Sequence, residues 1–358
     1  MQVARMTPSV PRTQARDRNA RQPGRHARCA RATTPADLYA PLERALALRA
    51  PLLACADTSA FRVLNGAADG VPGLVLEKFD AVLVAQLHEG QLRLSTAQAR
   101  ELCACAQQRL GARAVYRKIF ARERSSALGR LEKLHTDPQP WLGQPVEPEL
   151  PVLESGARFL VRPYDGYSVG LFLEQRENRR RVRALAAGRC VLNAFAYTCG
   201  FSVAAALGGA TATVSVDLSG KCLDWGRRNF AANGIEPAAH SFIRSDIFDY
   251  YRRAHRCGRR FDLIILDPPT FARSRRPRRV FTVAADLERL IAGAVELLNP
   301  GGYLLLATNH RGTSRQRLER LAAQAAGRRP LQVAERPGLP LDFRGDADYA
   351  KTVLVRVG

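Results

Sequence analysis

The sequence lacks the marks of several protein classes. Its eight cysteines include no Cys-x-x-Cys pair, and the one close pair, Cys103 and Cys105, lies in a helical pattern. Such spacing indicates neither a zinc site nor a disulfide framework. No apolar run is long enough to span a membrane, and the first residues lack the apolar core of a secretory signal. We therefore expect a reducing, cytoplasmic compartment, no bound metal and no membrane partner.

Acidic residues are scarce relative to basic ones. The 358 residues include 33 Asp and Glu against 55 Lys and Arg, which gives a net charge of +22. A balance this basic predicts a polyanionic partner, and nucleic acid is the first candidate. A genome rich in G and C would explain why Arg is preferred to Lys, but it would not explain the excess of basic over acidic residues.

The first 35 residues have almost no apolar periodicity. Their only acid is Asp17, and their eight arginines are Arg5, Arg12, Arg16, Arg18, Arg21, Arg25, Arg28 and Arg31. A segment of this composition cannot offset the entropy lost on ordering, so we predict a disordered arm at 1–35. Its composition fits an arm that grips RNA, an organellar transit peptide, or a start codon assigned too far upstream.

The next part of the chain has the pattern of a small α/β unit. Strands are expected at 61–66, 73–79, 82–87 and 114–120. Ser95 is expected to cap a helix that runs to about Leu110. Prolines then crowd residues 138–151, which can continue neither a helix nor a central strand. We therefore predict three parts: the arm at 1–35, a small α/β central domain at 36–150 that faces RNA, and a second domain at 151–358.

The second domain alternates between strands and helices. Strands are expected at 190–195, 213–217, 241–244, 263–266 and 303–307, and helices at 174–185, 202–207, 221–232 and 285–298. This alternation predicts an α/β fold with a Rossmann-like, doubly wound parallel sheet. Ligands bind such sheets at the carboxyl ends of the strands. The loops after Asn193, Asp217, Asp246 and Leu266 should therefore open onto one crevice.

The loop from Asn193 to Ser202 lies between a strand and a helix. Backbone amides at the start of a helix can receive an anionic group. The loop has one glycine, Gly200, whereas a dinucleotide fingerprint needs three to admit a pyrophosphate, so a nicotinamide enzyme is disfavoured. S-adenosylmethionine carries no phosphate, and its carboxylate needs less room. An ordinary strand-to-helix turn would give the same pattern.

Two acids follow the next strands. Asp217 ends a strand where a carboxylate can accept hydrogen bonds from both ribose hydroxyls, or it caps the following helix, unless Ser219 is the cap. Asp246 is placed to accept a hydrogen bond from an adenine amino group, with Ile247 or Phe248 packed on the ring. An exposed capping role for Asp246 is an equal alternative.

The run Asp267-Pro268-Pro269-Thr270-Phe271 is the most specific signal. Two prolines at a strand end remove two backbone donors and leave carbonyl groups as acceptors in the crevice. Those acceptors can hold the amino edge of a base, and Phe271 offers a ring for stacking. A rigid turn is the alternative. Arginines then crowd what we expect to be a loop that contacts phosphates: Arg273, Arg275, Arg276, Arg278 and Arg279.

From about Phe61 onwards, these motifs resemble the bacterial 23S ribosomal RNA methyltransferases, a group with a cytosine-C5 branch and a guanine-N7 branch. The matching segments are 65–66, 69–74, 170–176, the loop at 193–202 and 267–269. The resemblance implies a class I, S-adenosylmethionine-dependent methyltransferase domain behind a small central domain. It also implies that Phe172, Gln175 and Arg176 flank the cofactor.

Two departures narrow the resemblance. The cytosine branch uses a cysteine nucleophile in a Ser-Cys-Ser motif, but here the corresponding run, 307–312, reads Ala-Thr-Asn-His-Arg-Gly. Cys199 lies in the loop at 193–202, which the resemblance assigns to the cofactor and which we call the cofactor loop. There it takes the place of a small residue of the family. The run at 307–312, the Thr-Phe after the prolines and Leu-Asp-Trp at 223–225 resemble the guanine-N7 branch. The front of the chain lacks the RNA-binding PUA domain of the cytosine branch and the larger RNA-binding half of the guanine branch.

These observations predict an S-adenosylmethionine-dependent methyltransferase of 23S ribosomal RNA, with guanine N7 favoured. The residues expected to act on the base are Asp267, Pro268, Phe271 and Asn309. Those expected to bind the cofactor are Phe172, Gln175, Arg176, Asn193, Phe195, Thr198, Gly200, Asp217, Leu218, Asp246, Ile247 and Asp267. The alternatives are cytosine-C5 transfer and a catalytically silent RNA-binding assembly factor.

Overall fold

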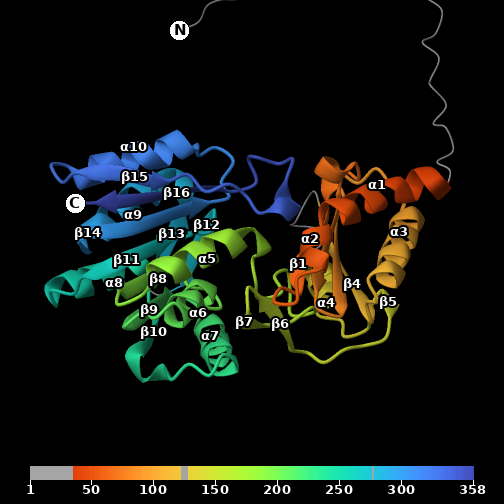
Figure 1. The fold of residues 1–358 in the computed structure, drawn as a ribbon, viewed down its shortest axis with the longest axis horizontal. Coiled ribbons are helices and arrows are strands. Elements are labelled where there is room, and N and C mark those ends of the chain that lie inside the picture. Colours follow the sequence, from red (N-terminus) through yellow and green to blue (C-terminus); the bar gives the residue numbers. More distant parts are fainter. Residues whose placement is uncertain (1–34, 122–127, 276–277) are drawn as a thin grey trace, which may run out of the picture.

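The computed structural model describes residues 35–121, 128–275 and 278–358, without the side chains of 35–36, 128–131, 237, 273–275 and 278–279. The predicted arm at 1–35 lies outside the described residues, apart from Pro35. Two lobes stand side by side (Figure 1), each built on its own sheet. None of the helices in the described ranges combines the length and apolar character needed to span a bilayer.

The first lobe is built on a five-stranded sheet. Its strands are β1 (Ala60–Asn65), β2 (Leu74–Phe79), β3 (Val82–His88), β4 (Ala114–Phe120) and β5 (Leu142–Gly143), in that order. Its helices are α1 (Pro35–Leu48), α2 (Ala50–Leu53), η1 (Gly66–Asp69), α3 (Thr96–Arg109) and α4 (Leu128–His135). Strands β3 and β4 are parallel, and the other neighbouring pairs are antiparallel.

Helices α1 and α3 bury the apolar side chains of one face of this sheet: Leu42 of α1 and Leu102 of α3 belong to the same core cluster as Leu76 of β2. The predicted start of α3 is confirmed. The Ser95 side chain accepts a hydrogen bond from the Gln98 amide, and the Gln98 side chain accepts one from the Ser95 amide. This reciprocal cap satisfies two helix-end donors.

The second lobe is a seven-stranded sheet in the order β10-β9-β8-β11-β14-β16-β15. Its strands are β8 (Cys190–Ala194), β9 (Ala212–Asp217), β10 (His240–Arg244), β11 (Phe261–Leu266), β14 (Leu298–Thr308), β15 (Leu331–Glu335) and β16 (Lys351–Val357). Only β16, antiparallel to β14 and β15, departs from the parallel pairing of the described strands of this sheet. The predicted doubly wound fold is confirmed.

Helices cover both faces of the large sheet. One face carries α5 (Arg176–Leu185), α6 (Gly200–Leu207) and α7 (Gly220–Ala232), and the other carries α8 (Ile247–Arg256), α9 (Val283–Glu296) and α10 (Arg315–Ala326). The chain runs outward from β8 to β10 and then returns to β11 on the other side of β8. The order of strands therefore reverses between β8 and β11, and such switch points are where open α/β sheets bind ligands.

Short elements lie between the lobes or beside the large sheet. They are β6 (Leu150–Glu154), β7 (Ala157–Val161), η2 (Leu173–Gln175), η3 (Pro237–Ala239), β12 (Phe271–Arg275), β13 (Arg278–Thr282) and η4 (Leu341–Phe343). One core cluster joins the lobes, with Phe79 of β2, Phe159 of β7 and Phe343 of η4 among its members. The boundary near residue 150 stays a prediction.

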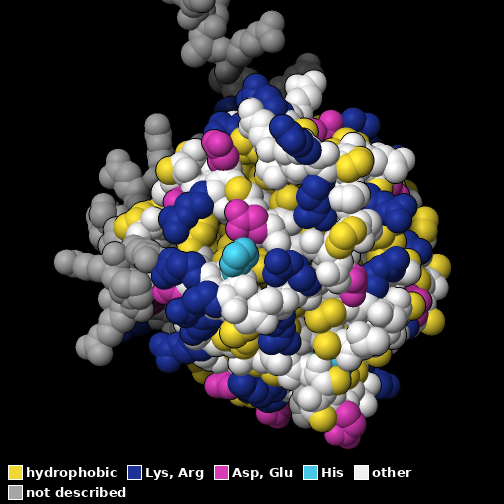
Figure 2. Space-filling view, turned by 90° about the vertical axis from the view of Figure 1, so that its left-hand side faces the viewer, with side chains coloured by type: hydrophobic (Ala, Val, Ile, Leu, Met, Phe, Trp, Pro, Cys, Tyr) yellow, Lys and Arg dark blue, Asp and Glu magenta, His cyan; other side chains and the backbone are white. Residues whose placement is uncertain are grey.

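Figure 2 shows the end of the second lobe that lies at the left of Figure 1. Basic side chains are spread over this face, and acidic ones are sparser. The face therefore follows the positive balance of the whole sequence, which a polyanion would complement.

Candidate functional site

The loop between β8 and α6 follows a tightly wound path. Phe195, Tyr197 and Cys199 have φ values of 59°, 48° and 62°, so every second residue is left-handed although none is glycine. Non-glycine residues in this region cost free energy and persist only where neighbours hold them. Here the Thr198 hydroxyl donates to the Gly170 carbonyl (2.6 Å), and the Asn229 amide donates to the Thr198 carbonyl (2.8 Å).

Asp217 connects this loop to the end of β9. One carboxylate oxygen accepts from the Tyr197 amide and the other from the Ser219 amide, each at 2.8 Å. The helix cap is Ser219, whose hydroxyl accepts from the Cys222 amide. Burial raises the pKa of Asp217 despite these bonds. A carboxylate has about four acceptor positions, and the Leu218 amide also bonds this one, so capacity for a further donor remains.

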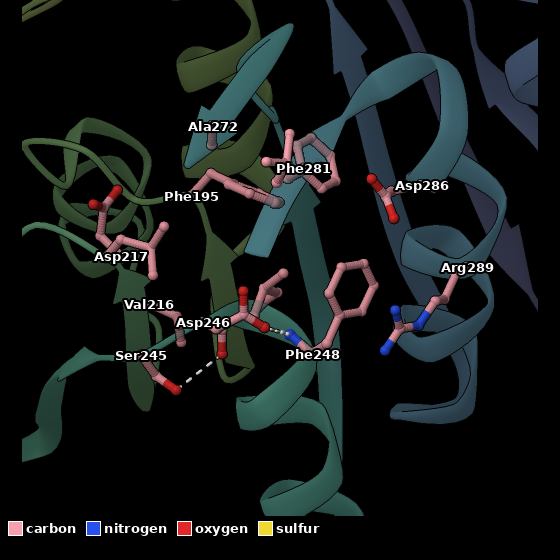
Figure 3. A pocket seen from close by; sticks show the side chains of 13 residues that line it. Phe195, Val216, Asp217, Ser245, Asp246, Phe248, Ala272, Phe281, Asp286 and Arg289 are labelled. Carbon is pink, nitrogen blue, oxygen red and sulfur yellow. Dashed lines mark hydrogen bonds between the residues drawn. The ribbon is translucent and has the colours of Figure 1, made fainter. Parts of the chain in front are cut away.

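A first cavity, which we call the Asp246 cavity, lies beyond Asp217 (Figure 3). Asp246 is the helix cap of α8, because one of its oxygens accepts from the amides of Phe248 and Asp249. Asp246 and Ile247 both line the cavity. Asp246 therefore caps the helix and lies at the predicted site at the same time. The remaining lining includes Phe195, Val216, Asp217, Leu218, Phe248, Phe281, Asp286 and Arg289.

Aromatic rings form one wall of the Asp246 cavity. The ring of Phe281 lies 5.2 Å from that of Phe195 and 6.4 Å from that of Phe248, measured between ring centroids. The Arg289 guanidinium lies over the Phe248 ring at 3.9 Å. A flat, apolar ring with a polar edge would fit between these rings and Asp246.

The second cavity, the Asp267 cavity, shares Phe195, Asp217, Leu218 and Ala272 with the first. It collects residues from the carboxyl ends of β8, β9, β11 and β14. Its predicted members are Phe172, Gln175, Phe195, Thr198, Gly200, Asp217, Leu218, Asp267, Pro268 and Asn309. The Thr270 hydroxyl donates to the Asn309 side-chain oxygen (3.0 Å), which joins the loops after β11 and β14.

Besides Asp217, two further carboxyl groups line the Asp267 cavity, those of Glu174 and Asp267. Burial and the nearby charge of Glu174 raise the pKa of Asp267 to about 7, although the Gln175 amide donates to it at 3.1 Å. Burial also raises the pKa of Glu174. The pair therefore holds protons at a pH where exposed acids are ionised, which is typical of functional sites.

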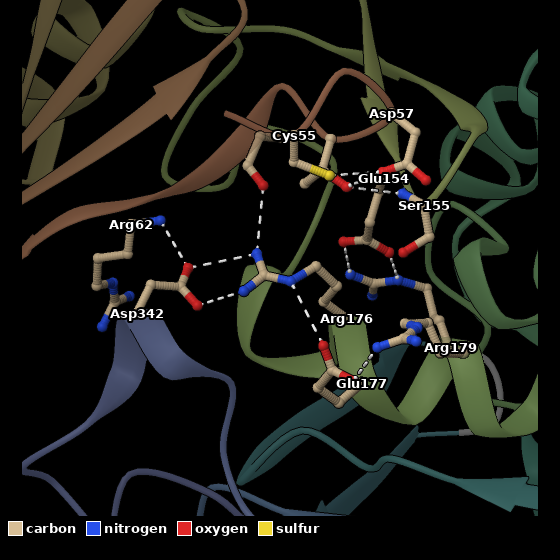
Figure 4. Close-up of polar contacts among 12 residues, drawn as sticks. Cys55, Asp57, Arg62, Glu154, Ser155, Arg176, Glu177, Arg179 and Asp342 are labelled. Carbon is tan, nitrogen blue, oxygen red and sulfur yellow. Dashed lines mark hydrogen bonds and ion pairs between the residues drawn. The ribbon is translucent and has the colours of Figure 1, made fainter. Parts of the chain in front are cut away.

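Two predicted cofactor residues lie elsewhere. Arg176 is 3% exposed and pairs with Asp342 of η4, and its guanidinium also donates to the Ala60 carbonyl of β1 (Figure 4). Asn193 is 1% exposed and donates to the Ser202 hydroxyl at 2.9 Å. Neither lines the two cavities: the contacts of both hold the scaffold, and their role as cofactor ligands stays a prediction.

The segment after the prolines also differs from the prediction. The expected arginine loop is an antiparallel hairpin, β12 and β13, with Arg275 opposite Arg278. The arginine side chains from 273 to 279 lie outside the described residues. Phe271 begins the hairpin, is 53% exposed and does not line the Asp267 cavity, so its stacking role stays a prediction.

Sequence reasoning missed several residues of the cavities. Glu174 and Arg179 line the Asp267 cavity, and Phe281 and Arg289 line the Asp246 cavity. Arg179 is buried and forms a two-point ion pair with Glu154 of β6 (Figure 4), 25 residues away. Glu174 had a local signal, since it lies in the segment 170–176 that carried the resemblance, but the other three depend on contacts distant in sequence.

None of the described cysteines lines the Asp267 cavity. Cys199 is in the adjoining loop but is fully buried, and burial raises the pKa of its thiol to about 12. A thiol that stays protonated is a weak nucleophile. The site can therefore hold a nucleoside-like ligand and a second flat group without offering a thiolate.

Comparisons with known proteins agree with this geometry. A family model described as S-adenosylmethionine-dependent methyltransferase matches residues 92–355. A ribosomal RNA large subunit methyltransferase of Deinococcus radiodurans is 37% identical over 336 residues, which cover 90% of this chain and 78% of the relative. Ribosomal RNA large subunit methyltransferase K of Neisseria meningitidis is 43% identical over 160 residues, 45% of each chain.

Solved structures are similar as well. One from Streptococcus mutans, described as an S-adenosylmethionine-dependent methyltransferase, superposes with a TM-score of 0.77 at 27% identity over 89% of this chain and 81% of its own. Another, a methyltransferase complexed with S-adenosylhomocysteine, gives a TM-score of 0.78 at 27% identity with the same coverage.

Proposed function

Because the chain belongs to the family of S-adenosylmethionine-dependent methyltransferases, we propose that it methylates a base of large-subunit ribosomal RNA, with guanine N7 as the acceptor atom. The protein is thus an enzyme, and S-adenosylmethionine is its cofactor. The RNA substrate is inferred from relatives that are large-subunit ribosomal RNA methyltransferases. A cytoplasmic location stays a prediction.

One observation carries the proposal. Asp267, Pro268 and Asn309, the groups expected to hold a base, line the same cavity as Thr198 and Gly200 of the cofactor loop. These residues come from strands on both sides of the switch point, where an open α/β sheet binds its ligands. A base and the reactive end of a cofactor would therefore meet in one enclosed space.

The residues fit the cofactor in chemical type. Asp217 has acceptor capacity left for a ribose hydroxyl. Asp246 and Ile247, beside the Phe248 and Phe281 rings, suit adenine. The first amides of α6, next to Gly200, suit a carboxylate. When bound, S-adenosylmethionine supplies a methyl group on a positively charged sulfur.

Methyl transfer to guanine N7 depends more on the orientation of the base than on acid–base catalysis. Guanine N7 has an in-plane lone pair at neutral pH, so no general base is needed to expose the nucleophile, and positioning supplies most of the acceleration. With a pKa of about 7, Asp267 is partly ionised at neutral pH, and in that form it can accept hydrogen bonds from the N–H groups of guanine; Asn309 can bond a base edge.

Cytosine-C5 transfer is less well supported. It would require a cysteine thiolate that attacks the base. Cys199, the cysteine within the cofactor loop, is buried with a raised thiol pKa, and its side chain faces α7 at Gly226. These facts favour acceptance of the methyl group by a ring nitrogen.

Nucleoside mass spectrometry tests the proposal. Total ribosomal RNA from cells without the gene, incubated with the purified protein and S-adenosylmethionine, should gain 7-methylguanosine. Asp267→Ala should reduce the rate by at least about 100-fold, on the scale of losing one preorganised polar contact. Asp224→Ala, which removes an exposed carboxylate on α7, is the matched control. A gain of 5-methylcytidine, or a wild-type rate for Asp267→Ala, would refute the assignment.

A further inference from the structure

The face of the first-lobe sheet opposite α1 and α3 is apolar at one end, with Phe79 and Val84, and polar at the other. Its side chains alternate with those that α1 and α3 cover, so they point toward the second lobe. The polar end is the one at which β3 and β4 finish, and its side chains are Arg62, Glu77, Gln86, His88, Lys118 and Phe120. We call the hollow between this face and segment 167–174 the His88 cavity.

The polar groups of this cavity are largely satisfied by one another. Glu77 accepts from the Arg62 guanidinium (2.8 Å) and from the Gln86 amide (2.8 Å). Arg62 also donates to Asn65 and to the Tyr349 hydroxyl. The charges are thus neutralised within the wall, and the cavity does not present a free cation suited to a phosphate.

Aromatic rings form the rest of the wall. The rings of His88 and Phe120 stack with centroids 4.7 Å apart and planes inclined by 17°, and Tyr167 lies 5.5 Å from Phe120. Burial and the charge of Arg62 lower the pKa of His88, so its ring is neutral near pH 7. Each of these three rings is only half-buried.

Hydrogen bonds and ring contacts hold the cluster of His88, Phe120 and Tyr167, which we call the ring cluster, in place. Lys118, 1% exposed, donates to the Gly166 carbonyl and so fixes the segment that carries Tyr167 to β4. His135 accepts from the Ile119 amide at 2.9 Å, and its ring meets the Tyr167 ring edge-on at 4.5 Å. A buried lysine is costly, and here it orders the ring cluster.

The His88 cavity adjoins the Asp267 cavity. Leu171, Phe172, Glu174 and Tyr197 line both. Phe172 is 43% exposed, and its ring lies 5.2 Å from that of Tyr197. An RNA strand whose target base enters the Asp267 cavity would therefore run past Phe172. The nucleotide next to the target would then lie at the stacked rings of His88 and Phe120.

We propose that the His88 cavity binds the nucleobase of a nucleotide that flanks the target in the RNA strand. This inference rests on the proposed RNA substrate. Half-buried aromatic faces, neutralised charges and a position beside the catalytic cavity match base stacking, which tolerates any base because each has a π-face. Base binding at this site explains why the rings of His88 and Phe120 in the first lobe are only half-buried on the side that faces the second lobe.

The test uses the full chain, S-adenosylhomocysteine and short RNAs. The probes are the fluorescent pentamer UUGUU and two versions with an abasic nucleotide on one or the other side of the guanosine. Phe120→Leu keeps apolar volume but removes the ring. It should weaken binding of the intact pentamer by roughly 5- to 150-fold, the usual range for one base stacked on one ring. One abasic pentamer should bind wild type and Phe120→Leu equally.

Tyr39→Leu is the matched control, because it removes a half-buried ring on the α1 side of the same lobe. It should leave pentamer affinity unchanged, and S-adenosylhomocysteine affinity should be the same in all three proteins. Equal pentamer binding by wild type and Phe120→Leu would overturn the inference, as would the absence of pentamer binding to wild type. Binding does not require methyl transfer, so loss of the 7-methylguanosine result would refute the proposed reaction without touching this one.

Discussion

At the scale of single residues, Cys199 and Gly226 form a matched pair. Cys199 is fully buried with a φ of 62°, and it faces Gly226 in the middle of α7. A Cβ atom at position 226 would lie 2.3 Å from the Cys199 sulfur and 2.9 Å from its Cβ. Glycine weakens a helix interior, so its presence here follows from the cysteine.

This pairing predicts a change of sign in a double-mutant cycle. In the wild-type background Gly226→Ala should destabilise the protein by about 1–3 kcal/mol through overpacking. In the Cys199→Gly background the clash is gone, and the same substitution should stabilise it by about 0.5–1 kcal/mol through helix propensity. Urea denaturation of the four proteins measures both effects. Equal effects in the two backgrounds would contradict the pairing.

Asp267 predicts a dependence of stability on pH. Its pKa is about 7 in the folded protein and about 3.9 in an unfolded chain. Between these values the folded state holds the proton more tightly, so this residue's contribution to stability falls as pH rises from about 4 to 7. Asp267→Asn cannot ionise, and its melting temperature relative to wild type should therefore be higher at pH 7.5 than at pH 5. A constant difference between the two proteins would contradict the raised pKa.

The sequence predicted which residues line the cavities better for some positions than for others. Asp217 and Asp267 line a cavity as expected, because an acid at the end of a parallel strand must face the ligand edge of the sheet. Arg176 does not line either cavity, because it pairs with Asp342, 166 residues away, and no local pattern reports such a pair. Asn193 does not line one either, because a shift of one residue along a strand decides whether a side chain points to the core or to the cavity.

At the scale of elements, η4 fastens the two lobes. Asp342 is fully buried, accepts from the Arg62 amide of β1 at 2.8 Å and pairs with Arg176 of α5. The Arg62 guanidinium also lies 4.0 Å from the centroid of the Phe343 ring. One short turn from the second lobe thus satisfies groups of both lobes.

Asp342→Ala should therefore be strongly destabilising. It leaves the Arg176 guanidinium buried without its carboxylate, a loss of about 3–5 kcal/mol. Asp342→Asn keeps an acceptor for the Arg62 amide and should lose less. Glu319→Ala, which breaks an ion pair with exposed Arg336, is the control and should leave the urea midpoint almost unchanged. Similar midpoints for Asp342→Ala and Glu319→Ala would show that η4 is not a fastening.

Elements with local signals were predicted well, and those fixed by distant partners were not. The start of α3 follows from Ser95 and Gln98 alone, and the parallel strands of the second lobe follow from apolar runs. The hairpin of β12 and β13 was taken for a loop because its arginines hide the alternation that indicates a strand. Strand β16 pairs with β14 and β15 only through the folded sheet, so nothing local reveals its partners.

At the scale of the whole molecule, positive charge is not confined to the terminal arm. Residues 1–34 contribute eight arginines and one aspartate, and the rest of the chain still carries a net charge of +15. Released counterions make binding to nucleic acid depend steeply on salt, by a power that follows the number of phosphates contacted. If the folded lobes themselves contact RNA, this dependence must persist without the arm.

We expect the affinity for ribosomal RNA to fall by at least about tenfold between 50 and 200 mM KCl, as it does for proteins that contact several phosphates. S-adenosylhomocysteine affinity should change little, because Asp217 and Asp246, the ligands we propose for it, are partly buried, and salt screens partly buried groups weakly. A protein that begins at Pro35 should keep a reduced but definite slope of log affinity against log salt. A slope of zero would assign all phosphate contacts to the arm, and an unchanged slope would assign them all to the lobes.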